Sequence, residues 1–325
     1  MLQLAAANLV TPMVLFFALG LVAALARSDL FVPEAIAKTL ALYLMMAIGF
    51  KGGVEMAKNG LDQKVFLLLA AGVFLSALIP LVGYAALRAT TALKSYDAAA
   101  IAAHYGSISI VTFVAATQTL SLLGLPYEGY LVAVAAVMEM PAIVTALLLA
   151  RRAKPPDGAK REGLGPLLRE VGLNGSVVML SGAFLIGWAT GPSGMEMISA
   201  FVIDPFRGIL CLFLLDMGLA AGRGLRAGAG NLRLPVLAFG IYMPLISAGL
   251  AGTLALALGL SVGGTALLIT LSASASYIAV PAAMRLALPE ADPCNYLTLS
   301  LGVTFPFNLA LGIPIYVGLA QRIGS

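Results

Sequence analysis

Long apolar stretches constrain this chain more than any other feature of its sequence. A helix that crosses a bilayer needs about 20 mostly apolar residues, and ten stretches approach or meet that length. Hydrophobic residues make up 61% of the chain and charged residues only 10%, whereas soluble domains carry roughly 25% charged residues. The sequence therefore predicts an all-α polytopic membrane protein with ten transmembrane helices. The ten stretches are Leu4–Ala26, Pro33–Ala57, Val65–Leu87, Asp97–Leu123, Tyr127–Ala150, Gly172–Ala189, Phe206–Ala221, Leu234–Leu258, Gly263–Ala287 and Tyr296–Gly318.

Basic residues are distributed unevenly over the connections between these stretches. Most Lys and Arg residues flank the connections after the first, third, fifth, seventh and ninth stretches. Because cytoplasmic connections carry the excess of basic residues, we expect a multi-pass protein of the cell inner (plasma) membrane with both termini outside. The net charge of +4 follows from this distribution and indicates no nucleic-acid partner. The two cysteines, Cys211 and Cys294, have no metal-ligand spacing.

A strongly polar segment divides the ten stretches into five and five. We divide the chain accordingly into a first five-helix repeat (1–152), a cytoplasmic linker (153–170) and a second five-helix repeat (171–325). An odd number of helices per repeat makes the second half enter the membrane from the opposite side. The two halves are therefore expected to form a 5+5 inverted repeat.

Internal similarity supports this division. "GSISIVTFVAA" at 106–116 matches "ASASYIAVPAA" at 273–283, and Gly49 aligns with Gly218 in the same order along the chain. Inverted repeats whose broken helices meet at the membrane midplane are typical of secondary transporters. The pattern thus favours a transporter with alternating access.

Each repeat places small and hydroxyl residues inside one apolar stretch, as "HYGSIS" at 104–109 and "LSASAS" at 271–276. Small residues permit close backbone approach and local unwinding, so we expect both helices to break here, with the breaks facing each other. A helix N-terminus suits an anion, and serine hydroxyls can donate to an anion or coordinate a cation. The alternative is that these residues only pack helices together. The candidate substrate-binding residues are Tyr105, Gly106, Ser107, Ser109, Ser272, Ala273, Ser274 and Ser276.

Polar residues in neighbouring stretches supply candidate cation ligands. Glu139 precedes Pro141, whose ring frees a backbone carbonyl, and the equivalent region of the second repeat contains Thr304, Pro306 and Asn308. Carboxylate, carbonyl and amide oxygens are hard ligands of the kind that a sodium ion prefers. We therefore expect Glu139, Thr304 and Asn308 to bind sodium, with interhelical hydrogen bonding as the alternative.

Three further polar residues allow structural and functional interpretations. Lys51 and Asp216 lie near equivalent points of the two repeats, and we expect them to form a buried pair. His104, the only histidine, is expected to pack between helices, with a proton relay as the alternative. A serine hydrolase using His104 is disfavoured because the chain has no G-x-S-x-G elbow. No catalytic residue is assigned, and the protein is not expected to be an enzyme.

The segments "AAHYGSISIVTFVAA" (102–116) and "SASASYIAVPAAMRLALPEADP" (272–293) resemble the paired motifs of the SbtA family, the sodium-dependent bicarbonate symporters. The resemblance extends over essentially the whole chain. It implies an elevator-type transporter in which a core domain moves against a gate domain. It also implies a homotrimer, with bicarbonate as substrate and sodium as the co-transported ion.

One departure from that family concerns regulation. Cyanobacterial members have a longer central cytoplasmic segment and are inhibited by a PII-like regulatory protein, whereas this linker has only about twenty residues, which puts that partner in question. Two alternatives to sodium–bicarbonate symport stay open: a proton- or sodium-coupled transporter of another small anion, and an anion channel. Saturable flux that requires sodium would separate a symporter from a channel.

Overall fold

The computed structural model is all-helical over the residues that it describes, which are 10–60, 62–152, 169, 173, 175–228, 233–277, 280, 281, 284, 288 and 290–323. Most of the predicted linker, and with it the question of a PII-like partner, lies outside this part. The helices in chain order are α2 (Pro12–Leu25), α3 (Glu34–Asn59), α4 (Gln63–Thr90), α5 (Ser95–Gly106), α6 (Ile110–Leu122), α7 (Leu131–Val137), α8 (Glu139–Arg152), α10 (Gly175–Val202), α11 (Phe206–Gly228), α12 (Leu234–Leu258), α13 (Val262–Ser272), α15 (Pro293–Leu299), η1 (Ser300–Thr304), α16 (Phe305–Phe307), η2 (Asn308–Gly312) and α17 (Ile313–Ile323).

Seven segments of the described chain are long and apolar enough to cross a membrane, which confirms a polytopic membrane protein. They correspond to seven of the ten predicted stretches, and one of them combines α5 with α6. Two further stretches form shorter apolar helices, α2 of 14 residues and α13 of 11 residues. The sixth stretch forms α10, which bends at Gly191 (φ 58°, ψ −151°) directly before Pro192. Proline cannot donate the helical hydrogen bond, so α10 is not one straight span.

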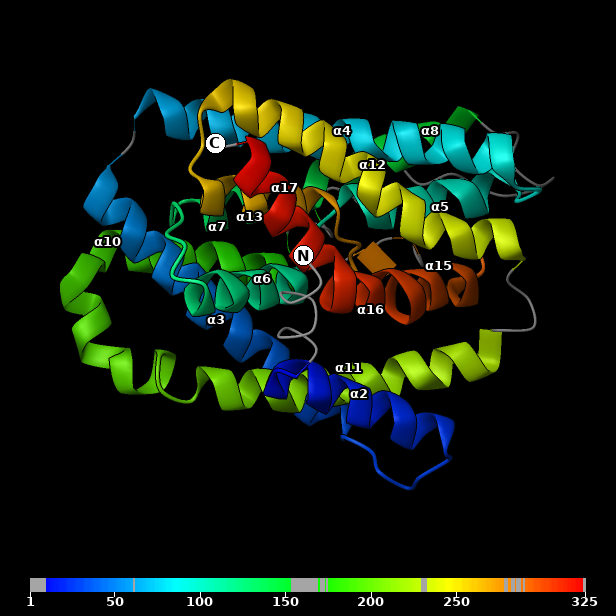
Figure 1. Ribbon diagram of the computed structural model, residues 1–325, viewed down its shortest axis with the longest axis horizontal. Helices are drawn as coiled ribbons and strands as arrows, with labels where there is room; N and C mark the ends of the chain where they lie inside the picture. Colours follow the sequence, from blue (N-terminus) through cyan, green and yellow to red (C-terminus); the bar gives the residue numbers. More distant parts are fainter. Residues whose placement is uncertain are drawn as a thin grey trace.

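The helices form two groups (Figure 1). One group, which we call the four-helix layer, consists of α2, α3, α10 and α11, in which α3 packs along α10 and α2 along α11. The other group, which we call the crossover body, contains α4 to α8 and α12 to α17, with α4 packed on α5, α8 and α12. The interrupted helices α5, α6 and α13 lie inside the crossover body.

Glycines bring the helices of the four-helix layer into close contact. A Cβ atom on Gly20 or Gly218 would lie 2.1 Å from a backbone carbonyl oxygen across the α2–α11 contact. A Cβ atom on Gly49 or Gly187 would lie 2.4 Å or 2.2 Å from one across the α3–α10 contact. Only glycine permits backbones to approach so closely. Gly49 and Gly218, which the sequence comparison aligns, thus each lie at a close backbone contact, Gly49 in the α3–α10 pair and Gly218 in the α2–α11 pair.

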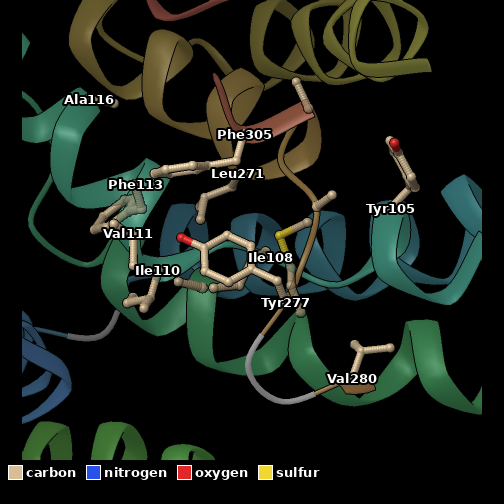
Figure 2. Close-up of a cluster of buried hydrophobic side chains, with 14 of the residues drawn as sticks. Tyr105, Ile108, Ile110, Val111, Phe113, Ala116, Leu271, Tyr277, Val280 and Phe305 are labelled. Atoms are coloured by element: carbon tan, nitrogen blue, oxygen red, sulfur yellow. The ribbon is translucent and has the colours of Figure 1, made fainter. Parts of the chain in front are cut away.

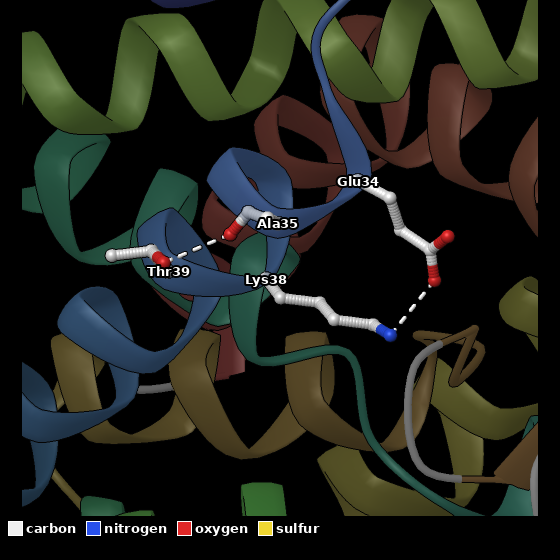
Figure 3. A network of polar contacts seen from close by, with 4 residues as sticks. All are labelled: Glu34, Ala35, Lys38 and Thr39. Atoms are coloured by element: carbon white, nitrogen blue, oxygen red, sulfur yellow. Dashed lines mark hydrogen bonds and ion pairs between the residues drawn. The ribbon is translucent and has the colours of Figure 1, made fainter.

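The first turn of α3 is charged where the helix begins after Pro33. Glu34 forms an ion pair with Lys38 (2.7 Å), and the Thr39 hydroxyl donates to the Ala35 carbonyl (2.8 Å; Figure 3). Both charged side chains are exposed, so this surface pair contributes little to the stability of the helix. Because charge is costly in a bilayer, the apolar part of α3 begins only after this first turn.

Candidate functional site

The fourth predicted stretch breaks where the sequence predicts. α5 ends at Gly106, and Ser107 and Ser109 are extended before α6 begins. A Cβ atom on Gly106 would lie 2.2 Å from the Cγ atom of Pro80 in α4, so this position requires glycine. The Ser109 hydroxyl caps α6 by accepting hydrogen bonds from the N–H (3.2 Å) and the hydroxyl (2.9 Å) of Thr112. The break is therefore fixed on both sides.

The ninth predicted stretch also breaks. α13 ends at Ser272, and residues 273–277 are not helical. The Ser274 hydroxyl donates to a carbonyl at the end of α13 (2.7 Å), and the Asn308 side-chain amide donates to the Ala273 carbonyl (2.8 Å). These bonds replace the helical N–H donors that the two carbonyl groups would have in a continuous helix. The residues directly after this segment lie outside the described part of the chain.

The two breaks contact each other, as the sequence predicts. The Ser109 N–H donates to the Ser274 hydroxyl (2.8 Å), and the Ser276 N–H donates to the His104 carbonyl (2.7 Å). Figure 2 shows Tyr277 beside the residues of the first break. All of these residues are buried. We call this contact between the breaks the crossing.

Several candidate substrate ligands already have partners inside the protein. The Ser107 hydroxyl donates to Glu139 Oε2 (2.7 Å), and the Ser109 hydroxyl caps α6. The Ser274 hydroxyl both donates and accepts. These side chains hold the crossing together, and substrate binding by them stays a prediction.

Other donors at the crossing have no partner within the part of the chain that the structure describes. The N–H groups of Ile110 and Val111, in the first turn of α6, make no hydrogen bond to the described residues. The buried Ser272 hydroxyl makes none either. The Tyr277 hydroxyl lies near Ser109 without a hydrogen bond of good geometry. Free N–H groups at a helix N-terminus, with hydroxyls beside them, suit a small anion.

Glu139 lies at a second irregularity in the first repeat. A one-residue interruption at Met138 separates α7 from α8. The buried Ser76 hydroxyl bridges the interruption, donating to the Met138 carbonyl (2.5 Å) and accepting from the Ala142 N–H (3.1 Å). Glu139 is 8% exposed, and its carboxylate accepts from Ser107 at the first break. A carboxylate is thereby held inside the protein next to the crossing.

Thr304 and Asn308 lie in the last membrane segment, where η1 and η2 widen the helix to π geometry. Such π turns are frequent at functional sites. The Thr304 hydroxyl donates to the Gly240 carbonyl (2.7 Å) and therefore accepts from the Tyr105 hydroxyl (2.5 Å). Asn308 Oδ1 accepts from the Tyr316 hydroxyl (2.7 Å). Both side chains are fixed by neutral partners.

The three candidate sodium ligands thus lie around the crossing with separate partners. Glu139 bonds to the first break and Asn308 to the second, while Thr304 bonds to Tyr105. Within the described residues, no group of three or more His, Cys, Asp or Glu side chains could hold a metal ion. A sodium site here would combine one carboxylate with neutral oxygens, and the role of the three residues stays a prediction.

The expected pair of Lys51 and Asp216 is wrong. The Lys51 ammonium lies 4.7 Å from the ring centroid of Phe206, at the start of α11. Asp216 lies ten residues further along that helix, a distance of about 15 Å. No ion pair joins the two in the part of the chain described here.

His104 packs between helices, as expected. Its Nδ1 atom donates to the Ala100 carbonyl (2.7 Å), and its ring stacks on Tyr296 with centroids 4.6 Å apart. Its Nε2 atom has no partner among the described residues. Among the described residues, neither ring nitrogen of His104 bonds to a serine.

Sequence reasoning missed Ser76, Tyr277 and Tyr316 as parts of this region. Ser76 is a single serine in an apolar stretch, where helix packing is the ordinary interpretation. Tyr277 lies inside the quoted second motif, directly after its last serine, and that position was the available signal. Tyr316 follows Asn308 by two helical turns, which places the two side chains on one face.

Broken helices that cross inside a polytopic membrane protein are the architecture of secondary transporters. Comparison with known families gives the family: the model described as the Na+-dependent bicarbonate transporter superfamily matches residues 12–321. The chain belongs to this superfamily, which confirms the resemblance, and it is a transporter rather than an enzyme. No curated individual protein is matched by the chain.

Proposed function

We propose that this protein imports bicarbonate together with sodium and binds both ions at the crossing. The observation that carries the proposal is the contact between the two breaks, beside the free N–H groups of Ile110 and Val111. Membership of the Na+-dependent bicarbonate transporter superfamily supports the choice of ions.

The anion site uses helix-end dipoles and hydrogen bonds. Each charge-assisted hydrogen bond to the anion contributes about 1.5–3 kcal/mol, and a helix N-terminus contributes about half a positive charge. Neither hydroxyl-rich segment, 104–109 or 271–276, contains Lys or Arg. The protein alone therefore leaves the anion only partly neutralised, and a nearby sodium ion completes the neutralisation.

The sodium site uses oxygens that border the crossing. Glu139 supplies a carboxylate, and Thr304 and Asn308 supply neutral side-chain oxygens. The hydrogen bond from Ser107 to Glu139 connects the first break with this carboxylate. Each ion then occupies part of one shared site and strengthens binding of the other.

Alternating access follows from an elevator movement of the crossover body, as core domain, against the four-helix layer, as gate domain. The glycine contacts of the α2–α11 and α3–α10 pairs support a 5+5 inverted repeat, since a twofold relation between the halves exchanges these pairs. The distribution of basic residues supports an inner-membrane protein with both termini outside. The homotrimer rests on the family resemblance.

Radiolabelled bicarbonate uptake into proteoliposomes tests the proposal. An inward sodium gradient should drive bicarbonate above its equilibrium level, and uptake should saturate and stop when potassium replaces sodium. Uptake that follows a pH gradient and ignores sodium would show proton coupling instead. Flux that does not saturate and never exceeds equilibrium would show a channel. Either result would overturn the proposed symport.

A further inference from the structure

A cavity of about 90 Å³, lined by both apolar and polar side chains, lies between the four-helix layer and the crossover body, outside the crossing. Its walls come from α3, the end of α6, the connection before α7 and the start of α11. The polar and aromatic lining includes Lys51, Thr117, Gln118, Tyr127 and Phe206. None of these residues belongs to the site proposed above.

The charge around this cavity is positive. The Lys51 ammonium rests on the Phe206 ring and makes no ion pair with the described residues. Arg207, the next residue of α11, is close enough to repel it. Glu55 also lines the cavity, but its carboxylate pairs with Lys58 (2.8 Å). Of the two charged side chains in the cavity wall, Glu55 is thus neutralised by Lys58, and Lys51 makes no ion pair with the described residues.

Hydrogen-bond donors accompany this charge. Arg207 Nε donates to Gln118 Oε1 (3.1 Å), which fixes the amide and leaves its NH₂ group without a partner among the described residues. The Tyr127 hydroxyl lies beside the Thr117 side chain in the cavity wall. Unpaired cations beside neutral donors suit an oxyanion.

The cavity lies on a short path to the crossing. Phe113 lines the cavity, is 1% exposed, and follows Ser109 by one helical turn. Figure 2 shows Phe113 in the same buried cluster as Ile110 and Tyr277. Thr117 follows Ser109 by eight residues, about 12 Å along α6. Phe113 thus lines the cavity and belongs to the helix that begins at the crossing.

We infer that this cavity is a second anion site, in which Lys51 and Arg207 hold a small monovalent oxyanion before it passes Phe113 to the crossing. The passage to the crossing rests on the proposed function. The anion preference of the cavity does not, because it follows from the Lys51 ammonium and the polar groups of the cavity wall, together with Arg207 beside Lys51.

Reagent chemistry tests the anion preference without transport. In protein with Cys211 and Cys294 replaced by serine, Thr117→Cys is labelled in detergent at low salt with an anionic or a cationic methanethiosulfonate. The anionic reagent should be favoured. A unit charge about 6 Å away in a water-like medium changes the labelling rate of each charged reagent about threefold, in opposite directions for the two reagents. Lys51→Gln should therefore lower the ratio of the anionic to the cationic labelling rate about tenfold.

Matched variants make this result specific. Lys51→Arg should keep the ratio, and so should Lys64→Gln, which removes an exposed cation at the start of α4. Arg207→Gln should lower the ratio in the same way. It replaces Lys51→Gln as the test if the Lys51→Gln protein does not fold. An equal ratio in the parent and both glutamine variants at the cavity would overturn the inference.

Uptake kinetics test the passage to the crossing. In proteoliposomes that import bicarbonate, Lys51→Gln should raise KM for bicarbonate about threefold at low salt and leave the maximal rate unchanged. An unchanged KM in a variant with the altered reagent ratio would show that the cavity binds anions off the transport path. That result would overturn the inference that the anion passes from this cavity to the crossing. If the parent imports no bicarbonate, the proposed function fails while the reagent ratio still decides the anion site.

Discussion

At the scale of single residues, the serines and polar side chains around the crossing bond mainly to one another. The Ser107 hydroxyl is the only described side-chain donor to the Glu139 carboxylate. In Ser107→Ala this carboxylate loses a charge-assisted bond of about 1.5–3 kcal/mol, so the sodium concentration for half-maximal uptake should rise about tenfold or more. Ser121→Ala, which removes an exposed α6 hydroxyl bonded to the Thr117 carbonyl, is the control. Identical sodium dependence in both variants would contradict a role for Ser107 and Glu139 in sodium binding.

The sequence predicts residue types better than residue partners. Paired serine motifs identify both breaks because hydroxyl and small residues are unusual inside two equivalent apolar stretches. Aligning the two repeats, however, does not show which residues of one repeat contact which residues of the other. Lys51 therefore faces Phe206 rather than Asp216, and the Asn308 contact with Ala273 becomes visible only in three dimensions.

At the scale of helices, close backbone contact holds the four-helix layer together. A Cβ atom on Gly187 would lie 2.2 Å from the Phe50 carbonyl oxygen, whereas one on Gly182 of the same helix would meet nothing within 4 Å. Gly187→Ala must separate α10 from α3 and should destabilise the protein by about 1–3 kcal/mol, and Gly182→Ala should not. Thermal unfolding in detergent measures both. Equal midpoints would show that the two helices do not pack as closely as described.

Helix positions are largely predictable, while helix irregularities are not. Hydrophobic length identifies membrane helices because the bilayer imposes about 20 residues on each. The bend at Gly191 and the π turns around Pro306 depend on neighbouring helices as well as on local sequence. The sequence therefore predicts ten uniform membrane helices, whereas the described helices differ in length, and α2 and α13 are short.

At the scale of the whole molecule, the account requires relative movement of the two helix groups. A Cβ atom on Gly302, in the crossover body, would lie 3.2 Å from the Cγ atom of Leu225 in the four-helix layer, so the two positions are in direct contact. In protein without native cysteines, Leu225→Cys with Gly302→Cys should form a cross-link that stops uptake until it is reduced. Gly240→Cys with Val303→Cys, inside the crossover body (3.2 Å), should leave uptake intact. Full uptake through the first cross-link would contradict the elevator movement.

The central claim is that sodium and bicarbonate share one site at the crossing, and calorimetry of bicarbonate binding at several sodium concentrations tests it most directly. Coupling between two ligands is reciprocal and commonly changes affinity by about fivefold or more. We predict that the Kd for bicarbonate falls at least that far as sodium rises, and that Asn308→Ala, which removes the side chain bonded to Ala273, reduces this dependence. The same Kd in sodium and in potassium would contradict the shared site.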